Sequence, residues 1–546
     1  MIAARPRPSS FDRPGVRTLA AIGLAILIGV LTVAAPALPF VGLWLACCVL
    51  AVALGLALGA ARMESLVLVL LPATVLTDSA LVPFEGRYVP AAAAMIALVV
   101  AARQLLPGGL ARLRSRPWYA AVLLAYGVWA LVTLGSSTDR ALSATYVAGL
   151  ALSLTTCAVI LPGWWTAERM ERVIAAIALI GIVIVATGWL LLTLRGVVLF
   201  GKDVGVYFIE ELTLFGQGTG VTFFQNYGPF VGPSTEPLAF ATAASLYLAS
   251  RTTGIRRLAA YAAAVVVIAG LVVTFSREGL IMAAIATAAL VAYDLRRHRL
   301  NVAVAAAAGF LAIFALTSLM GVVGVFGRLD LTAQWYGQTA VPILMNPDHT
   351  QRGDVSTPSV TPGQGPPVAT PSPVVVYPAV VDLKTASSLD ARFSLWAAAL
   401  AATEKSPVVG YGLGTDATAI VPYLNGQDAR LQGVTTHSTF MRMLVEMGIP
   451  GLLLQVWLSL VAAAVAIRAI FRRSSKAMTV LAGCLAAIIF HELFGTLIFG
   501  GFGYSNFLFA ALTSILALSD LGTSDATVLS APEPQAGGLS PIMPAG

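Results

Sequence analysis

Residues 173–194 read VIAAIALIGIVIVATGWLLLTL, a continuous apolar stretch without a charged side chain. In an α-helix, about 20 apolar residues cross the hydrocarbon core of a bilayer. Because that core offers no water to backbone polar groups, a spanning segment is either a helix or a strand of a closed barrel. The stretch lacks the alternation of a barrel strand, so it predicts a transmembrane helix.

Similar stretches recur along the chain of 546 residues, which is 58% hydrophobic and only 11% charged. This composition excludes an ordinary soluble protein. We expect an all-α polytopic integral membrane protein with about 14 transmembrane helices. A cleaved signal peptide is the alternative for the N-terminal apolar stretch at 18–35, but the length of that stretch favours a span. The predicted spans are 18–35, 41–60, 65–82, 89–106, 118–135, 143–162, 173–194, 236–250, 258–275, 278–294, 302–326, 449–468, 477–496 and 503–519.

The basic residues indicate the topology. The net charge is +7, and most of the 33 Lys and Arg residues lie in alternate loops between the predicted spans. Basic loops remain in the cytoplasm, so this pattern places both termini there in a multi-pass protein of the cytoplasmic membrane. The charge is therefore explained by topology, and we expect no nucleic-acid partner.

The spans and the loop compositions divide the chain into regions. Two long segments are expected on the outer side, and the second of them carries short helices beside a Pro/Thr/Ser-rich insert that is typical of disorder. The regions are a cytoplasmic arm (1–17), a first block of about 11 spans (18–326) with an outer loop (195–235), a large outer loop (327–448) with the disordered insert (355–380), the last three spans (449–519) and a disordered tail (520–546).

Ionisable side chains at the outer ends of the spans are candidates for a functional site. Arg277 and Glu278 lie in a very short turn between two spans, and Glu236 opens another span. His491 and Glu492 lie near the outer end of the thirteenth span. Ionisable groups at membrane depth are costly and usually functional, although snorkelling to water or pairing with neighbours is the simpler alternative.

The large outer loop offers a second group of candidates. Arg392 and Trp396 lie on a predicted helix that ends near Lys405, and His437 precedes another helix. Arg442 and Glu446 are four residues apart and are expected to pair along that helix. Arg392 suits a phosphate by its planar guanidinium, and His437 suits a proton acceptor near neutral pH. A solvated arginine and a capping histidine are the alternatives.

Metal and nucleotide motifs are missing from the sequence. The four cysteines lie in apolar runs, and no histidine or carboxylate set has metal-ligand spacing. GQGTG (216–220) lacks the Lys of a phosphate loop, and GYGLGTD (410–416) lacks a strand–turn–helix unit around it. We expect no metal and no cofactor, with arginines holding any phosphate.

Three segments resemble one family. DARFSLWAAALAATEKSPVVGYGLGT (390–415), THSTFMRMLVEMGIPGLLL (436–454) and TFSREGL (274–280) are similar, in order and spacing, to the signature of the O-antigen ligase and Wzy-type polymerase superfamily. The sequence departs from that signature in Ser438, where the family usually has Asn, and in Glu278, where it has a small residue. The insert also enlarges the loop.

The resemblance implies a GT-C-like membrane glycosyltransferase that is independent of metals. Its donor would be a polyprenyl-pyrophosphate-linked glycan, and its acceptor a hydroxyl of a glycan or glycolipid on the outer face. Arg277 and Arg392 would bind the pyrophosphate, and His437 would activate the acceptor or position the donor. Glu236, Glu278, Arg442, His491, Glu492 and Trp396 are further candidates for substrate binding. A transporter or flippase of lipid-linked sugars is the main alternative, followed by a peptidoglycan-type polymerase and a scaffold.

Overall fold

The computed structural model describes 51–53, 55–56, 63–75, 89–193, 198–199, 202–203, 209–214, 217–224, 235–273, 277–296, 309, 389–424, 433–472, 475–493, 495 and 503–518. The predicted spans at 18–35, 41–60 and 302–326 therefore lie wholly or mostly outside the described residues. The predicted disorder of the Pro-rich insert and of the tail also concerns residues outside them.

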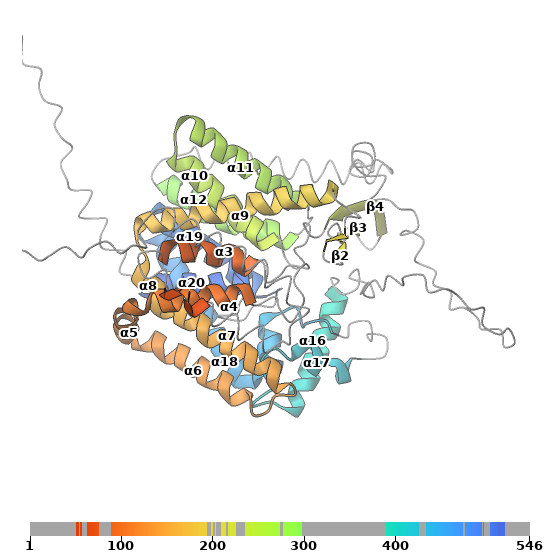
Figure 1. Cartoon of the computed structure of the whole chain (residues 1–546). Helices are drawn as coiled ribbons and strands as arrows, with labels where there is room; N and C mark the ends of the chain where they lie inside the picture. Colours follow the sequence, from red (N-terminus) through yellow and green to blue (C-terminus); the bar gives the residue numbers. More distant parts are fainter. Residues whose placement is uncertain are drawn as a thin grey trace, which may run out of the picture.

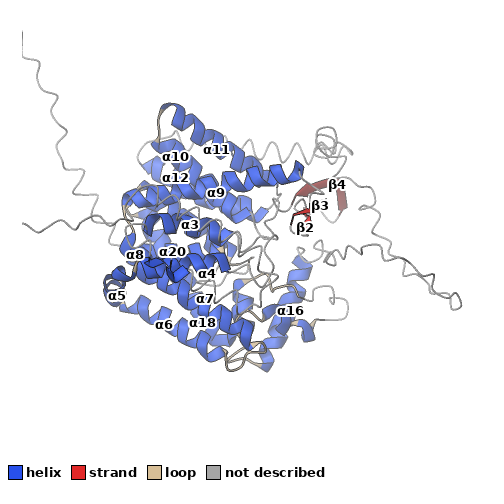
Figure 2. Ribbon diagram, in the orientation of Figure 1, coloured by secondary structure: helices blue, strands red, loops and turns tan. Residues whose placement is uncertain are grey.

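Helices dominate the described part of the chain, as Figures 1 and 2 show. Those of the first block are α3 (Met63–Val75), α4 (Val89–Ala101), η6 (Arg103–Leu105), α5 (Leu106–Arg114), α6 (Pro117–Thr133), α7 (Arg140–Leu154), η7 (Thr155–Ile160), α8 (Leu161–Trp164), α9 (Ala167–Thr193), α10 (Thr235–Arg251), α11 (Gly254–Val273) and α12 (Arg277–Arg296). Those that follow are α16 (Leu389–Lys405), α17 (Asp416–Ala419), η9 (Val421–Tyr423), α18 (Thr439–Phe471), α19 (Lys476–His491) and α20 (Tyr504–Leu518).

Five of the described helices are long and apolar enough to cross a membrane, or six if the bent pair formed by α4 and η6–α5 is one span. The expected count of 14 is not reached in this part of the chain. Shorter apolar helices at Met63–Val75, Pro117–Thr133, Lys476–His491 and Tyr504–Leu518 coincide with four more predicted spans. The structure is thus that of a multi-pass helical membrane protein.

The surface of the bundle supports this conclusion. Large apolar side chains on α11 and α18 face outward, among them Ile255 (77% exposed) and Leu453 (62% exposed). In water such a surface would be unfavourable, whereas lipid tails match it. α10 lies inside and buries almost all of its residues against α9, α11 and α12.

Local signals explain where several helices begin and end. Asp139 caps α7 by accepting a hydrogen bond from Leu142 N at 3.0 Å, and Ser475 caps α19 in the same way through Met478 N at 3.3 Å. α16 ends at Lys405, as the sequence predicts, directly before Ser406–Pro407. Capping side chains of this kind satisfy backbone N–H groups that have no partner inside the helix.

Short strands between α9 and α10, in the loop predicted to be outer, depart from the all-helical prediction (Figure 2). β1 (Val198–Leu199) pairs antiparallel with β2 (Lys202–Asp203), and β3 (Ile209–Leu214) pairs antiparallel with β4 (Gln217–Phe224). β4 contains Val, Thr and two Phe residues, which favour strands. Two residues connect β3 to β4, a length that favours a hairpin.

Helix packing brings the last helices against the first block. α12 and α10 contact α19, while α18 contacts α19, α6 and α16. In Figure 1, α16 and α17 lie at one end of the bundle, on the side of β2, β3 and β4, and α5 lies at the opposite end. α16 and α17 therefore cover the end of the bundle at which α18 begins.

Candidate functional site

The candidate site is built around a break in α18. Gly448 has φ +68°, which interrupts the helix two residues before Pro450. In an unbroken helix the carbonyl groups of Val445 and Glu446 would accept from the N–H groups of residues 449 and 450. Pro450 has no N–H, and Ile449 N donates instead to Pro407 O at 2.8 Å. The break thus leaves two carbonyl groups that need other donors.

The glycine-rich turn after α16 supplies these donors. Tyr411 N donates to Val445 O at 3.0 Å, and Gly412 N donates to Glu446 O at 2.8 Å. Gly410 has φ +65°, and a Cβ there would lie 2.5 Å from the carbonyl carbon of Glu446. The turn therefore requires glycine at this position. The glycine-rich turn after α16 and the break in α18 thus form a single hydrogen-bonded unit.

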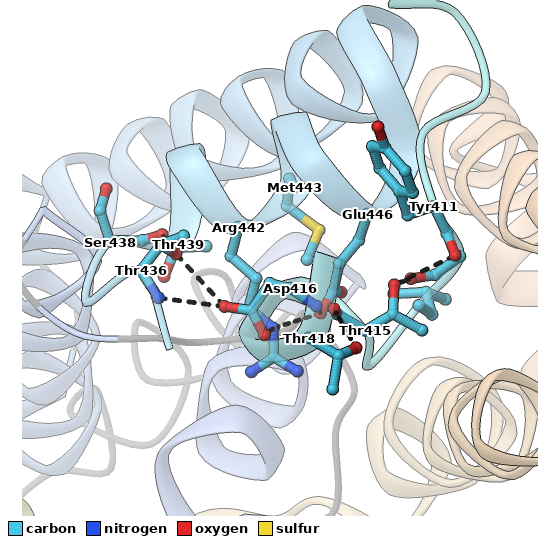
Figure 3. Close-up of polar contacts among 12 residues, drawn as sticks. Tyr411, Thr415, Asp416, Thr418, Thr436, Ser438, Thr439, Arg442, Met443 and Glu446 are labelled. Atoms are coloured by element: carbon cyan, nitrogen blue, oxygen red, sulfur yellow. Dashed lines mark hydrogen bonds and ion pairs between the residues drawn. The ribbon is translucent and has the colours of Figure 1, made fainter. Parts of the chain in front are cut away.

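A buried charge network joins Asp416, which follows the glycine-rich turn, to Arg442 and Glu446 of α18 (Figure 3). Arg442 Nε is 2.8 Å from Glu446 Oε1 and 3.7 Å from Asp416 Oδ1. The predicted pairing of Arg442 with Glu446 is thereby confirmed. All three side chains are at most 9% exposed, and the guanidinium also lies over the ring of Tyr146 at 5.7 Å. The charge of Arg442 is thus directed into the protein.

This network fixes the residue before His437. Asp416 Oδ2 accepts from Thr436 N at 3.1 Å and from Thr436 Oγ1 at 3.4 Å, as Figure 3 shows. On the other side, Trp396 Nε1 donates to Thr436 O at 2.9 Å. Both polar groups of this peptide segment are therefore held, one by α17 and one by α16.

His437 itself adopts a left-handed backbone conformation. Its φ is +48°, and it is the one residue other than glycine with positive φ in the part of the chain that the structure describes. Such a conformation costs about 1–3 kcal/mol and persists only where the surroundings impose it. The hydrogen bonds on Thr436 supply that restraint. A strained histidine that is held from both sides indicates a functional position.

The electrostatic surroundings of His437 identify its neighbours. Burial lowers the pKa of its imidazole, and the positive charge of Arg392 lowers it further. The negative charges of Asp416 and Glu278 oppose this change in the pKa. Arg392 and Glu278, which are far apart in the sequence, thus act on the same ring. The neutral imidazole is the favoured form near pH 7, as a proton acceptor requires.

A second cluster joins three of the predicted residues. His491 Nε2 is 2.7 Å from Glu236 Oε1, and His491 Nδ1 contacts Glu278 Oε1. These residues belong to α19, α10 and α12. Thr439 N donates to Glu492 O at 3.1 Å, and Thr439 Oγ1 donates to Gly495 O at 3.0 Å. The cluster is therefore tied to the start of α18, two residues after His437.

Glu492 faces the interior of the bundle. Its carboxylate accepts from Gln455 Nε2 and from Ser459 Oγ, both at 2.6 Å. The Gln455 amide oxygen in turn accepts from Tyr126 OH at 3.3 Å. Glu492 is 0% exposed, so these contacts connect α6, α18 and α19 inside the protein.

The structure thus brings most of the predicted site residues to one region. His437 is within electrostatic reach of both Arg392 and Glu278, and Glu278 contacts His491, which also contacts Glu236. Arg277 begins α12, next to Glu278, but its side chain is outside the described part. The roles of these residues in binding or catalysis stay predictions. Among the described residues, no group of three His, Cys, Asp or Glu side chains is arranged to hold a metal ion.

Two residues of the site were not among those predicted from the sequence. Asp416 and Thr436 form the link between the glycine-rich turn and His437. The acidic residue that ends GYGLGTD is the signal that indicates Asp416, because glycines before an acidic residue suit a tight turn followed by a helix start. No pattern in the sequence indicates Thr436, whose contacts arise from tertiary packing.

Residues 262–456 match the family model described as O-antigen ligase. The matched range includes α12, α16, the glycine-rich turn, His437 and the break in α18. No curated protein matches the chain. The match confirms the resemblance to the O-antigen ligase and Wzy-type superfamily over this region, and it supports a membrane enzyme that transfers glycans, of the ligase or polymerase type.

Proposed function

We propose that the protein transfers a glycan from a polyprenyl-pyrophosphate donor to an acceptor hydroxyl on the outer face of the cytoplasmic membrane. The observation that carries the proposal is the position of His437, strained and held by Thr436, beside the guanidinium of Arg392. The family match over the same residues supports it.

Arg392 is proposed to bind the donor. Negative charge grows on the pyrophosphate as the bond to the sugar breaks, and a fixed guanidinium near a low-dielectric boundary stabilises that charge. Its planar fork matches two phosphate oxygens. Arg277 is proposed to add a second positive charge from the start of α12. In this scheme the arginines supply the charge that a divalent ion provides in other transferases.

His437 is proposed to act on the acceptor. Its neutral imidazole accepts the proton of the attacking hydroxyl while the new bond to the sugar forms and the bond to the pyrophosphate oxygen breaks. A positioned base of this kind contributes about 10²–10⁴-fold to the rate. The lowered pKa of His437 keeps the ring in the accepting form at neutral pH. The nearby Arg392 thus serves both the leaving group and the base.

The placement of charged helices supports the proposed orientation. α5 carries Arg112 and Arg114 in its last turn and lies at the end of the bundle opposite α16 and α17 (Figure 1). Basic segments favour the cytoplasmic side, so α16, α17 and His437 would face outward. We propose cytoplasmic N- and C-termini on the same basis.

The test uses purified protein in detergent with a labelled polyprenyl-pyrophosphate-linked oligosaccharide as donor. The acceptor is the unmodified glycan extracted from cells in which the encoding locus is disrupted. Wild-type protein is expected to form a new glycosidic bond, and a chelator is expected to leave the rate unchanged. Detergent removes the two compartments that a flippase needs. Normal binding without bond formation would therefore support the transporter alternative instead.

Cells lacking the protein separate the two types of transfer. Single repeat units in place of long chains would assign a polymerase, because only chain growth is lost. Long chains that remain on the polyprenyl carrier would assign a ligase, because only the final transfer is lost. Unaltered glycans would contradict both assignments.

A further inference from the structure

We infer that the cluster of Glu278, His491 and Glu236 is the acceptor-binding side of the site, and that it recognises a sugar hydroxyl through the Glu278 carboxylate. The inference rests on the proposed function, because it assigns one of the two substrates of that reaction to these residues. It is based on the charge of the cluster, on its exposure and on its position relative to His437.

The charge of the cluster follows from its hydrogen bonds. Both ring nitrogens of His491 face carboxylate oxygens, Nε2 toward Glu236 at 2.7 Å and Nδ1 toward Glu278. Each contact is a hydrogen bond only if a proton lies in it. The ring then carries two protons between two carboxylates, or one proton with one carboxyl group protonated. Either arrangement leaves one net negative charge on the cluster.

Only one side chain of the cluster is partly exposed on the protein surface. The side chain of Glu278 is 26% exposed, whereas those of His491 and Glu236 are 7% and 6% exposed. Oε1 of Glu278 is the atom that contacts His491, which leaves Oε2 as the acceptor for a ligand. Glu236 and His491 are therefore positioning residues that hold the Glu278 carboxylate from behind.

The position of the cluster distinguishes the two substrates. The charges of Arg392 and Glu278 both act on His437, with opposite signs. A pyrophosphate is attracted to the guanidinium and repelled by a cluster of net negative charge. A neutral sugar hydroxyl donates well to a carboxylate, and hydrogen bonds to charged acceptors are the stronger ones. The donor pyrophosphate is thus assigned to the Arg392 guanidinium and the acceptor hydroxyl to the Glu278 carboxylate.

The backbone connects this cluster to the base. Thr439 donates to the carbonyl groups of Glu492 and Gly495, on either side of the short segment after His491. A Cβ at Gly495 would lie 2.1 Å from His491 Nε2. The ring is thus packed between its own backbone turn and the carboxylates. Any side chain at position 495 would displace it and, with it, Glu278.

Steady-state transfer in detergent tests the inference, with the donor and the extracted acceptor described above varied separately. Glu278→Gln keeps the shape and removes the charge. We expect it to raise KM for the acceptor about tenfold or more while KM for the donor stays within about twofold. Gly495→Ala changes no charged residue and is expected to raise the same KM. Glu171→Gln is the matched control and should change neither, because Glu171 contacts Arg251 at the end of α10 opposite Glu236.

The outcomes separate this inference from the proposed function. No transfer by wild-type protein would reject the proposed function itself. Transfer with an unchanged acceptor KM in Glu278→Gln, or with a raised donor KM, would overturn the inference and leave the proposed function standing. Thermal unfolding of each variant in the same detergent identifies a folding defect, and Glu278→Asp then serves as a second test. Asp retains the charge and should restore part of the acceptor affinity that Gln loses.

Discussion

Replacing Asp416 with Ala should destabilise the protein and displace His437, the proposed base. Asp416 is 1% exposed and accepts from Thr436 N at 3.1 Å, while Arg442 Nε lies 3.7 Å away. A buried N–H group that loses its partner costs about 1–3 kcal/mol. Breaking a buried ion pair costs about 3–5 kcal/mol, but Arg442 retains its closer contact with Glu446 at 2.8 Å. We therefore expect a loss of about 3–5 kcal/mol in the free energy of unfolding.

Reversible unfolding in mixed detergent micelles measures this loss. Asp139→Ala is the matched control, because it removes an exposed aspartate that accepts one backbone N–H at the start of α7. Loss of such a cap costs about 0.5–2 kcal/mol. The loss in free energy of unfolding for Asp416→Asn should lie between those for Asp139→Ala and Asp416→Ala, because Asn keeps the shape of the side chain and one acceptor oxygen. Equal losses for Asp416→Ala and Asp139→Ala would refute the view that Asp416 organises the site. Full transfer activity in a folded Asp416→Ala protein would refute its link to His437.

Three further predictions concern the same region. Gly448→Ala should lower the free energy of unfolding by at least about 1–2 kcal/mol from backbone strain alone, because φ at this position is +68°. A Cβ there would also lie 2.2 Å from a facing carbonyl oxygen. Gly108→Ala is the control and should not lower the free energy of unfolding, because a Cβ at position 108 meets nothing within 4 Å. The pKa of His437 is lowered, so the acid limb of the pH profile of kcat/KM should lie below a pH of about 6.5. Arg392→Met removes the positive charge that lowers this pKa and should move the limb to higher pH. The stability that the neutral ring contributes is present above the unfolded-state pKa and is lost as the pH falls through the folded-state pKa. Trp396→Phe loses the hydrogen bond to the carbonyl of Thr436 and should lower the free energy of unfolding by about 0.5–1.5 kcal/mol. The activation free energy of transfer should rise by more than this amount. Equal transfer rates of the wild-type protein and Trp396→Phe would contradict the positioning role of Trp396.

The sequence predicts the local features of this protein well. Within the described residues, helices occur where apolar stretches predict them, because the bilayer leaves the backbone few alternatives. α16 ends at Lys405 because a Ser-Pro pair follows it, and Arg442 pairs with Glu446 because a helix places residues four apart on one face. Each of these features depends on neighbours in the sequence.

Features that depend on contacts between residues far apart in the sequence were not predicted. The sequence pattern of α16 groups Phe393, Trp396 and Leu400 on one face, yet Phe393 and Leu400 are about half exposed, and the helix buries Leu395 and a row of alanines instead. Small side chains allow α16 to pack closely against α18, which no periodicity of large residues reveals. The strands between α9 and α10 were likewise not expected, because the glycines of this loop interrupt the pattern of the β-favouring residues of β4.

The site residues show the same limit. Glu236, Glu278 and His491 were each predicted as isolated candidates at the ends of different spans. Their contacts with one another come from the packing of α10, α12 and α19, which the sequence does not encode in any short pattern. Asp416 was missed for a related reason, since its partners Thr436 and Arg442 follow it by 20 and 26 residues.

A single-turnover transfer measurement tests the central claim most directly, namely that Arg392 and His437 act together on one lipid-linked donor. Limiting labelled donor is mixed with excess enzyme and saturating acceptor in detergent, and the new glycosidic bond and the released polyprenyl pyrophosphate are counted together. We predict one pyrophosphate released for each bond formed by the wild-type protein, and a fall in rate of about 10²-fold or more in Arg392→Ala and in His437→Ala. Wild-type rates in both variants, or bonds formed without release of the carrier, would contradict the account.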